Sequence, residues 1–303
     1  MRIAPTVVGL GEVLWDLLPS GRQLGGAPAN FAYGSHLLGN RALIASRIGA
    51  DELGQEIRRR LLGGGMSDES LQVDSTYPTG TVSVEVDAEG RPNFDIRYPA
   101  AWDFLEWNQG WSTLAQSADA VCFGSLAQRS DVARATILNF LDQTRPEALR
   151  IFDVNFRQSS YSRAIVTDSM QRAKIVKLSQ EELPRVAELL TIPVTDDREF
   201  ATRLIRRFGL NLVCITRGAQ GSLLANTTHF HEHPGFRVEI KDTVGSGDAF
   251  TAGLVHEYLQ AGSLARMNQT ANQMGAWVAS CAGAMPRPPE AGLRKTLEQL
   301  QVG

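Results

Sequence analysis

A glycine-rich turn runs directly into an apolar segment in the stretch "DTVGSGDAFTAGL". Gly245, Ser246 and Gly247 would expose successive backbone N–H groups at the start of a helix expected from about Asp248 to Gln260. Unsatisfied N–H donors and the helix dipole attract an anion, and Asp248 would lie beside it. Amides that stabilise a migrating phosphoryl group, next to a carboxylate that accepts a proton, suit phosphoryl transfer. The pattern alone supports equally well an acid that only stabilises the helix start.

A second glycine cluster, "GGAPANFAYGSHLLG", begins at Gly25. It places Gly26 and Pro28 at the entrance of a helix, with Asn30 on the first turn. Upstream, "GEVLWDLLP" puts Asp16 after the first expected strand, and ligands of parallel sheets bind at the carboxyl ends of strands. Asp16 and Asn30 together offer acceptors and donors for several neighbouring hydroxyl groups. Alone, Asp16 would more often be a solvated or helix-capping acid.

Two common nucleotide-binding motifs are missing from the chain. The pattern GxxxxGK[ST] does not occur, and "GLGEVL" after the first expected strand lacks the third glycine of a dinucleotide-binding fingerprint. The turn of Gly245, Ser246 and Gly247 is therefore the place where a phosphate group is expected to bind.

The two clusters, in this order and at this separation, resemble the motifs of the PfkB carbohydrate kinase family, which has a ribokinase-like fold. Intermediate segments agree, so the resemblance covers nearly the whole chain. The segments most similar to the fructokinase branch are "GEVLWDLLP", "RIGADELG", "TGTVSVEVDAEGRPNF", "DVNFR" and "ITRGAQGS". The resemblance implies an ATP-dependent kinase that transfers the γ-phosphate to a sugar hydroxyl, converting fructose to fructose 6-phosphate.

The resemblance also implies roles for individual residues. Asp248 is expected to deprotonate the sugar hydroxyl, while Gly245, Ser246 and Gly247 form the anion hole for the transferred phosphate. The residues expected to bind the sugar are Asp16, Gly26, Asn30, Tyr98 and Arg157. In similar kinases, the arginine of "DVNFR" lies near the phosphates or an acidic sugar. Trp102 is the other aromatic candidate, besides Tyr98, to close over the sugar. The residues expected to lie along ATP are Ser179, Thr216, Gly218, Gly221 and Asn272.

Metal ions are implied by the same resemblance: Mg²⁺ with ATP and, in many relatives, a monovalent cation such as K⁺. Asp242 opens the loop expected to bind that cation, with backbone carbonyls near Cys281 and Gly283 closing the shell. Many relatives carry an Asn-x-x-Glu motif that affects magnesium and phosphate, whereas here "KLSQEEL" supplies Ser179 and Glu182. Because serine lacks the reach of the amide, the magnesium–water network is expected to differ. Glu182 is alternatively a solvated acid in a helix first turn.

The elements that must position these residues follow an alternating pattern. Short β-branched runs alternate with amphipathic segments of helix length and lie at 6–11, 41–49, 119–125, 149–155, 173–179 and 210–218. They predict an α/β fold with a mainly parallel central sheet between two helical layers, which the resemblance makes a ribokinase-like three-layer α/β/α sandwich. At 76–98 the pattern changes to a hairpin. We expect a single kinase domain over 1–303, with a small β lid formed from about 12–24 and 76–100. Such a lid would exclude water from the reactive groups.

Composition limits what the protein binds. Thirty basic against 33 acidic side chains give a formal net charge of −3, which argues against nucleic-acid binding driven by bulk charge. The uncharged segment between Arg266 and Arg287 contains several Asn and Gln residues, so a buried helix is favoured over a membrane span. The N-terminus lacks a signal-peptide pattern, and three widely separated cysteines predict reduced thiols in a cytoplasmic protein. The resemblance allows a homodimer formed through the lids.

Two further groups have competing interpretations. Three histidines that alternate along an expected strand resemble a metal-binding ladder, but a solvated strand face is favoured because no Cys or helix-borne carboxylate accompanies His229, His231 and His233. Three tryptophans near helical spacing, Trp102, Trp107 and Trp111, are expected in the core rather than stacked on a base.

Alternatives to a fructokinase remain open on the sequence. Arg157 is compatible with an acidic sugar, and the resemblance does not fix the branch of the family. The phosphoryl acceptor could therefore be 2-keto-3-deoxygluconate, another ketose or a nucleoside. Outside the enzymes, the chain could be a non-catalytic sugar-binding regulator, although the intact Gly-x-Gly-Asp argues against it.

Overall fold

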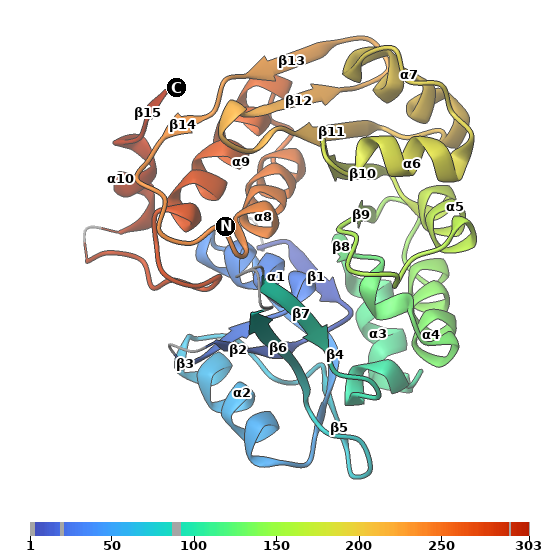
Figure 1. Ribbon diagram of the computed structural model, residues 1–303, viewed down its shortest axis with the longest axis vertical. Helices are drawn as coiled ribbons and strands as arrows, with labels where there is room; N and C mark the ends of the chain where they lie inside the picture. The colour runs from blue at the N-terminus through green and yellow to red at the C-terminus, as the bar shows by residue number, and fades with distance from the viewer. Residues whose placement is uncertain (1–3, 19–20, 87–91, 291, 303) are drawn as a thin grey trace.

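The computed structural model describes residues 4–18, 21–86, 92–290 and 292–302. Within these residues, nine strands form the central sheet in the order β13-β12-β11-β10-β9-β8-β1-β4-β5 (Figure 1). Neighbouring strands are parallel from β11 to β5, whereas β12 and β13 run antiparallel at one edge. The strands are β1 (Thr6–Leu10), β4 (Arg41–Gly49), β5 (Leu71–Asp74), β8 (Ala120–Phe123), β9 (Leu149–Asp153), β10 (Ile175–Ser179), β11 (Leu212–Thr216), β12 (Ser222–Ala225) and β13 (Phe230–His233). The six strands predicted from β-branched runs are confirmed.

Helices cover both faces of this sheet, as the nearly continuous apolar strands require. Successive residues of β1 point to opposite faces: Val7 packs with Phe31 and Phe250, whereas Val8 belongs to the cluster that contains Phe140. The first layer contains α1 (Ala27–Leu37), α8 (Ser246–Leu259) and α9 (Leu264–Ala279). The second contains α3 (Gln109–Ser117), α4 (Asp131–Asp142), α5 (Arg163–Arg172), α6 (Leu183–Leu190) and α7 (Asp197–Phe208) (Figure 1). The predicted three-layer α/β/α arrangement is confirmed.

A second, smaller sheet is formed by two segments that are distant in sequence. Its order is β3-β2-β6-β7, with β2 and β6 parallel and the two outer pairs antiparallel. The strands are β2 (Leu14–Leu18), β3 (Gly21–Gly25), β6 (Gly80–Val86) and β7 (Pro92–Ile96) (Figure 1). The predicted hairpin is therefore present, although most of its turn, 87–91, lies outside the described residues. These are the segments predicted to form the lid.

A buried tryptophan anchors the small sheet to the main body. Trp102, in η1 (Ala101–Phe104), is fully buried, and a Cβ at Gly80 would lie 2.3 Å from its Nε1 atom. The guanidinium of Arg129 lies 4.0 Å from the Trp102 ring centroid and forms an ion pair with Asp103 at 2.8 Å. Trp111 is also buried and Trp107 packs against the same core, so the predicted core role of all three tryptophans is confirmed.

The remaining elements complete the first layer and the edges. The helices are α2 (Glu52–Gly63) and α10 (Leu293–Glu298), the short strands are β14 (Phe236–Arg237) and β15 (Gln301–Val302), and the short 3₁₀ turns are η2 (Leu126–Gln128) and η3 (Gly218–Gln220). Among the described residues, no helix has the length and apolar character needed to cross a membrane. The uncharged segment between Arg266 and Arg287 contains most of α9. Met274 and Trp277 of this helix are buried against α8, so the predicted buried helix is confirmed.

Candidate active site

The site is built around the first turn of α8. Gly245 is the N-cap residue, with a φ of 76°, and a Cβ at this position would lie 2.5 Å from the Cβ of Ala284, so only glycine fits. The helix begins at Ser246, slightly earlier than predicted. Ser246, Gly247 and Asp248 therefore occupy the first turn, where backbone N–H groups lack intrahelical acceptors. The N–H group of Ser246 donates to the carbonyl oxygen of Thr243 at 3.2 Å. Gly245 offers no capping side chain to Gly247 and Asp248, so their N–H groups can bind an anion.

Asp248 is held by a residue of the other glycine cluster. Asn30, on the first turn of α1, donates from Nδ2 to Oδ2 of Asp248 at 2.8 Å. Burial raises the pKa of Asp248 above its usual range, and the hydrogen bond from Asn30 and the charges of Lys177 and Arg157 oppose that rise. A carboxylate with increased proton affinity, kept in one orientation, can accept a proton from a hydroxyl group.

A cavity of about 460 Å³ opens in front of Asp248. Its polar lining includes five residues predicted to bind sugar or to deprotonate it, namely Asp16, Gly26, Asn30, Arg157 and Asp248. Its apolar lining includes three residues of the small sheet, Leu14, Val82 and Ile96. The small sheet therefore forms one wall of this cavity, which is called the sugar-side cavity after the residues predicted to bind sugar.

Glycines bring the α1 turn close to the carboxylates of the cavity. A Cβ at Gly25 would lie 2.5 Å from Oδ2 of Asp16, and a Cβ at Gly26 would lie 2.6 Å from the carbonyl oxygen of Glu12. Burial raises the pKa of Asp16 to about 6, although the positive charge of Arg157 opposes the rise. Asp16 is thus available at neutral pH as an acceptor for hydroxyl groups.

A second cavity, also of about 460 Å³, lies on the other side of the α8 start. Residues predicted to lie along ATP line it, namely Thr216, Gly218, Gly221 and Asn272, together with Ser246 of the anion hole. Apolar contacts come from Val238, Ile240 and Phe250. Thr243 and Gly247 line both cavities. The two cavities therefore meet at the anion hole, where a phosphoryl group could pass from one ligand to the other.

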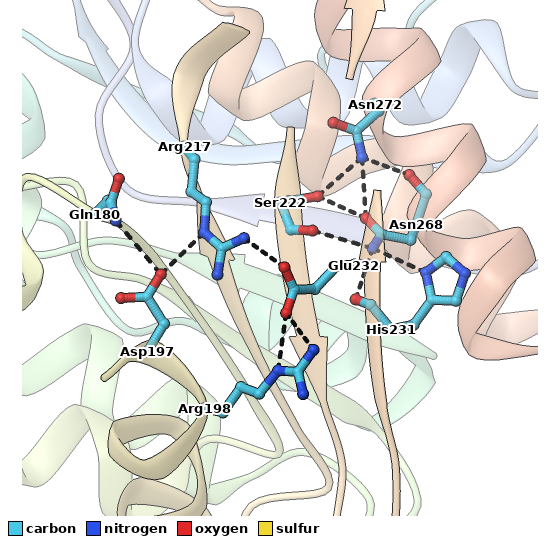
Figure 2. A network of polar contacts seen from close by, with 9 residues as sticks. All are labelled: Gln180, Asp197, Arg198, Arg217, Ser222, His231, Glu232, Asn268 and Asn272. Carbon is cyan, nitrogen blue, oxygen red and sulfur yellow. Dashed lines mark hydrogen bonds and ion pairs between the residues drawn. The ribbon is translucent and has the colours of Figure 1, made fainter. Parts of the chain in front are cut away.

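Asn272 is oriented by a polar network beneath this nucleotide-side cavity (Figure 2). Its Nδ2 atom donates to Oγ of Ser222 at 2.8 Å and to the main-chain oxygen of Asn268 at 2.7 Å. A main-chain oxygen only accepts, so the atom facing it must be nitrogen. The amide oxygen of Asn272 consequently points away from the network, as Figure 2 shows, and can accept a hydrogen bond from a ligand.

The loop that borders the nucleotide-side cavity is fixed by ion pairs. Arg217 pairs with Asp197 of α7 and Glu232 of β13, both at 2.9 Å (Figure 2). A Cβ at Gly221 would lie 1.8 Å from the carbonyl oxygen of His233, so the loop passes β13 without room for a side chain. Arg217 is thus a structural residue that sequence reasoning did not single out.

The two predicted metal residues bind backbone groups. The Glu182 carboxylate accepts from the N–H groups of Ser179 and Phe156, both at 2.7 Å. Asp242 accepts from the N–H groups of Val244 at 3.0 Å and Gly283 at 3.1 Å. Neither acid, nor Ser179, lines either cavity. Glu182 joins the turn before Arg157 to the end of β10, and Asp242 joins the α8 loop to residues 281–283.

Tyr98 does not reach the sugar-side cavity. Its side chain is 65% exposed, and its ring lies 5.1 Å from the guanidinium of Arg129. The other aromatic candidate, Trp102, is buried in the core, so Val82 and Ile96 approach the cavity from the small sheet instead. Tyr98 was predicted because it follows the hairpin, but it lies beyond the end of β7 at Ile96, where strand alternation no longer sets the direction of its side chain.

Two charged residues of the site were missed on the sequence. Lys177 is buried on β10, lines the sugar-side cavity and pairs with Asp153 at 3.0 Å. A Cβ at Gly247 would lie 3.1 Å from its Nζ atom, so the ammonium group lies beneath the anion hole. Glu12, 2% exposed, lines the same cavity. The lysine in the apolar run "IVKLS" and the acid directly after a buried strand were the available signals.

The histidines near β13 do not form a metal site. His231 contacts Nδ2 of Asn268 at 3.1 Å, and His233 accepts from the N–H group of Gly235 at 2.9 Å. In the described ranges, no group of three or more His, Cys, Asp or Glu side chains is placed to hold a metal ion. Cys122 and Cys214 are buried and Cys281 is partly exposed, and all three are free thiols.

Comparison with known proteins agrees with this geometry. A fructokinase of Escherichia coli is 30% identical over 305 residues, which cover 92% of this chain and 95% of the relative. A Vibrio cholerae fructokinase, solved with fructose, ADP and calcium ion bound, superimposes with a TM-score of 0.81 at 27% identity and covers 97% and 99% of the two chains. A Xylella fastidiosa fructokinase with bound ATP has the same fold, with a TM-score of 0.83 at 23% identity and coverage of 97% and 98%.

The model of the pfkB family carbohydrate kinases matches residues 21–291. That range includes Asn30, Arg157 and Asp248, which line the sugar-side cavity, and Gly247, which lies between the two cavities. The protein belongs to the pfkB family of carbohydrate kinases, as its two glycine clusters predicted.

Proposed function

We propose that the protein is an ATP-dependent fructokinase that converts fructose to fructose 6-phosphate and ADP. The observation that supports this most directly is the position of Asp248 and Gly247, because Asp248 faces the sugar-side cavity and Gly247 lines both cavities. The full-length similarity to fructokinases supports fructose as the acceptor.

In the proposed mechanism, fructose binds between α1 and the small sheet, and its primary hydroxyl points at Asp248. Asp16 and Asn30 bind other hydroxyl groups, and the apolar wall of Leu14, Val82 and Ile96 excludes water. Asp248 accepts the hydroxyl proton as the oxygen attacks the γ-phosphorus in line, and the bond to the β-phosphate oxygen breaks. The N–H groups of Gly247 and its neighbours, with Lys177 beneath them, stabilise the charge on the moving phosphoryl group.

The chain's residues fit ATP, Mg²⁺ and a monovalent cation. The nucleotide-side cavity offers apolar contacts for a base and leads to the anion hole. Mg²⁺ would neutralise charge on the phosphates, and Glu182, whose oxygens already accept two N–H groups, would reach it through water. At Asp242 the side-chain oxygens likewise accept N–H groups, so a K⁺ ion there would be bound mainly by the carbonyls of the two loops that Asp242 joins.

The test is a screen of phosphoryl acceptors by ADP release, with the phosphorylated position identified by NMR. We expect fructose to give the highest kcat/KM and fructose 6-phosphate as the product. A panel with 2-keto-3-deoxygluconate, other ketoses and nucleosides includes the alternatives. Clear preference for one of these would replace fructose as the substrate. Sugar binding without ATP turnover would instead favour a non-catalytic sugar-binding regulator.

One observation favours a second acceptor, 2-keto-3-deoxygluconate. Arg157 lines the sugar-side cavity, and its positive charge opposes the rise that burial causes in the pKa values of Asp16 and Asp248. An arginine at this place could pair with the carboxylate of an acidic sugar. Arg157→Ala separates the two substrates, because it should abolish most activity on the acid and leave most activity on fructose.

We further propose a cytoplasmic protein that forms homodimers through the small sheet. Free buried thiols at Cys122 and Cys214 and the need for ATP support a reducing, ATP-containing compartment. Within the described part of the chain, the outer strands β3 and β7 each pair on one side only, so their other edges could join those of a second copy. Light scattering of the purified protein tests the dimer, and fractionation of cells tests the location. The proposed partners are therefore ATP, a sugar and a second copy, with no nucleic acid and no membrane.

A further inference from the structure

Glu12 is a buried acid of the sugar-side cavity that the mechanism above does not use. It lies two residues after the end of β1, its side chain is 2% exposed, and it lines the cavity together with Asp16, Asn30 and Asp248. Buried carboxylates in folded proteins nearly always have hydrogen-bond partners for their oxygens. The partners of Glu12 therefore indicate what this side chain is for.

One oxygen of Glu12 has a structural partner. Oε1 accepts from the N–H group of Ala27 at 3.2 Å, and Ala27 is the first residue of α1. The N-cap residue Gly26 has no side chain to do this, so Glu12 caps the helix from another segment. This hydrogen bond fixes the turn that presents Asn30 to Asp248.

The other oxygen has no partner among the described residues. Oε2 of Glu12 is buried without a hydrogen bond, and Oδ1 of Asn30, which lines the same cavity, is also buried without one. Two acceptors cannot satisfy each other while Glu12 is ionised. A molecule in the cavity could supply donors to both oxygens, and a sugar offers several hydroxyl groups close together.

We propose that Glu12 is a sugar-binding residue whose Oε2 accepts a hydrogen bond from a hydroxyl group other than the one that is phosphorylated. The phosphorylated hydroxyl gives its proton to Asp248, so the hydroxyl bound by Glu12 serves to position the sugar. Through Oε1, the same carboxylate holds the turn that carries Asn30. This inference rests on the proposed function, because it requires that the cavity binds a sugar.

The arrangement also has a consequence for selectivity. Glu12 Oε2, Asn30 Oδ1 and Asp16 are acceptors of residues that line the same cavity, so a ligand with several hydroxyl donors is favoured. Removing one hydroxyl leaves a buried charged acceptor without a partner, which costs more than losing an exposed hydrogen bond. A hydroxyl next to Glu12 should therefore be the least dispensable of those that are not phosphorylated.

The test uses Glu12→Gln, which can still accept from Ala27 but replaces the free oxygen with a donor. We expect the KM for fructose to rise about 10- to 100-fold, as for loss of a hydrogen bond to a charged group, while the KM for ATP stays within twofold. The same comparison is made with fructose analogues that lack the 1-, 3- or 4-hydroxyl. For one analogue, the difference between wild type and Glu12→Gln should disappear, because the missing hydroxyl is the one that Glu12 binds.

Glu257→Gln is the matched control. Glu257 is also buried, but it accepts from Thr270 at 3.0 Å and from Arg266 at 2.7 Å and lines neither of the two ligand cavities. Its substitution should lower the melting temperature and leave the KM for fructose unchanged. A merely structural role for Glu12 would give the same result as this control.

Two outcomes overturn the inference: an unchanged KM for fructose in Glu12→Gln, or an equal increase in KM for every analogue. Sugar-dependent stabilisation in a thermal shift assay provides a second readout that does not need turnover. Failure of the proposed function looks different, because the wild type itself would then not phosphorylate fructose. If the wild type prefers another sugar, the same series is run with analogues of that sugar.

Discussion

Asn30 donates a hydrogen bond of 2.8 Å to Asp248, although 218 positions separate the two residues in sequence. The bond joins the first turns of α1 and α8 at the floor of the sugar-side cavity. The cluster predicted to bind sugar and the cluster predicted to bind phosphate therefore form one site, in which Asn30 orients the proposed base and also lines the cavity.

Asp248→Asn should reduce kcat by about 10²–10⁴-fold, because the amide cannot accept the hydroxyl proton. The fold should remain intact, since the amide is isosteric. Steady-state kinetics and a melting curve measure the two effects. Asp131→Asn is the control, because Asp131 is likewise an acid in a helix first turn, that of α4, but lies outside both cavities. Similar small losses for the two variants would mean that Asp248 only stabilises its helix.

Asn30→Ala should shift the acid limb of the kcat pH profile to higher pH. The hydrogen bond from Asn30 favours the ionised form of Asp248 and lowers its pKa, so removing the bond raises the pKa further. The KM for the sugar should also rise, because Asn30 lines the sugar-side cavity. A pH profile from about pH 5 to 9 measures the shift. An acid limb that stays in place would show that another group controls it.

Gly247→Ala should lower kcat by roughly 10²-fold, comparable with the loss of one oxyanion-hole donor. The new Cβ would lie 3.1 Å from Nζ of Lys177 and would occupy the junction of the two cavities. Gly63→Ala, in α2, is the control because nothing lies within 4 Å of its Cβ position. Activity equal to that of the control would place the phosphoryl group elsewhere.

The ligand-free protein should lose stability as the pH rises from about 4.5 to 7. Burial raises the pKa of Glu12 from 4.5 to about 7 and the pKa values of Asp16 and Asp153 from 3.8 to about 6. The folded state binds more protons than the unfolded state in this window, so the free energy of unfolding falls as the pH rises through it. For Glu12 alone the loss is about 3 kcal/mol.

Urea unfolding at a series of pH values measures this dependence. Glu12→Gln removes the titrating group, so its free energy of unfolding should change less between pH 4.5 and 7 than that of the wild type. Parallel curves for the two proteins would show that Glu12 has an ordinary pKa in the folded state.

The strands and helices could be predicted largely from the sequence because local patterns determine them. β-Branched runs gave the six parallel strands, and the glycine turns gave the starts of α1 and α8, where Gly26 and Gly245 adopt positive φ values that favour glycine. The reactive groups of "DTVGSGDAFTAGL" and "GGAPANFA" could be identified for the same reason. Short sequence motifs therefore contain most of the reactive groups predicted for this site.

Only the tertiary structure decided which side chains line the same cavity and how their surroundings shift their pKa values. Val82 and Ile96 are paired on β6 and β7 and line the cavity, whereas Tyr98 lies beyond the end of β7 and packs against Arg129 outside it. Glu12 and Lys177 adjoin or interrupt apolar runs in the sequence, but only packing places them in the cavity that Asp248 and Gly247 line. Burial and long-range contact set the pKa of a carboxylate and the partners of its oxygens, and no local pattern in the sequence encodes either.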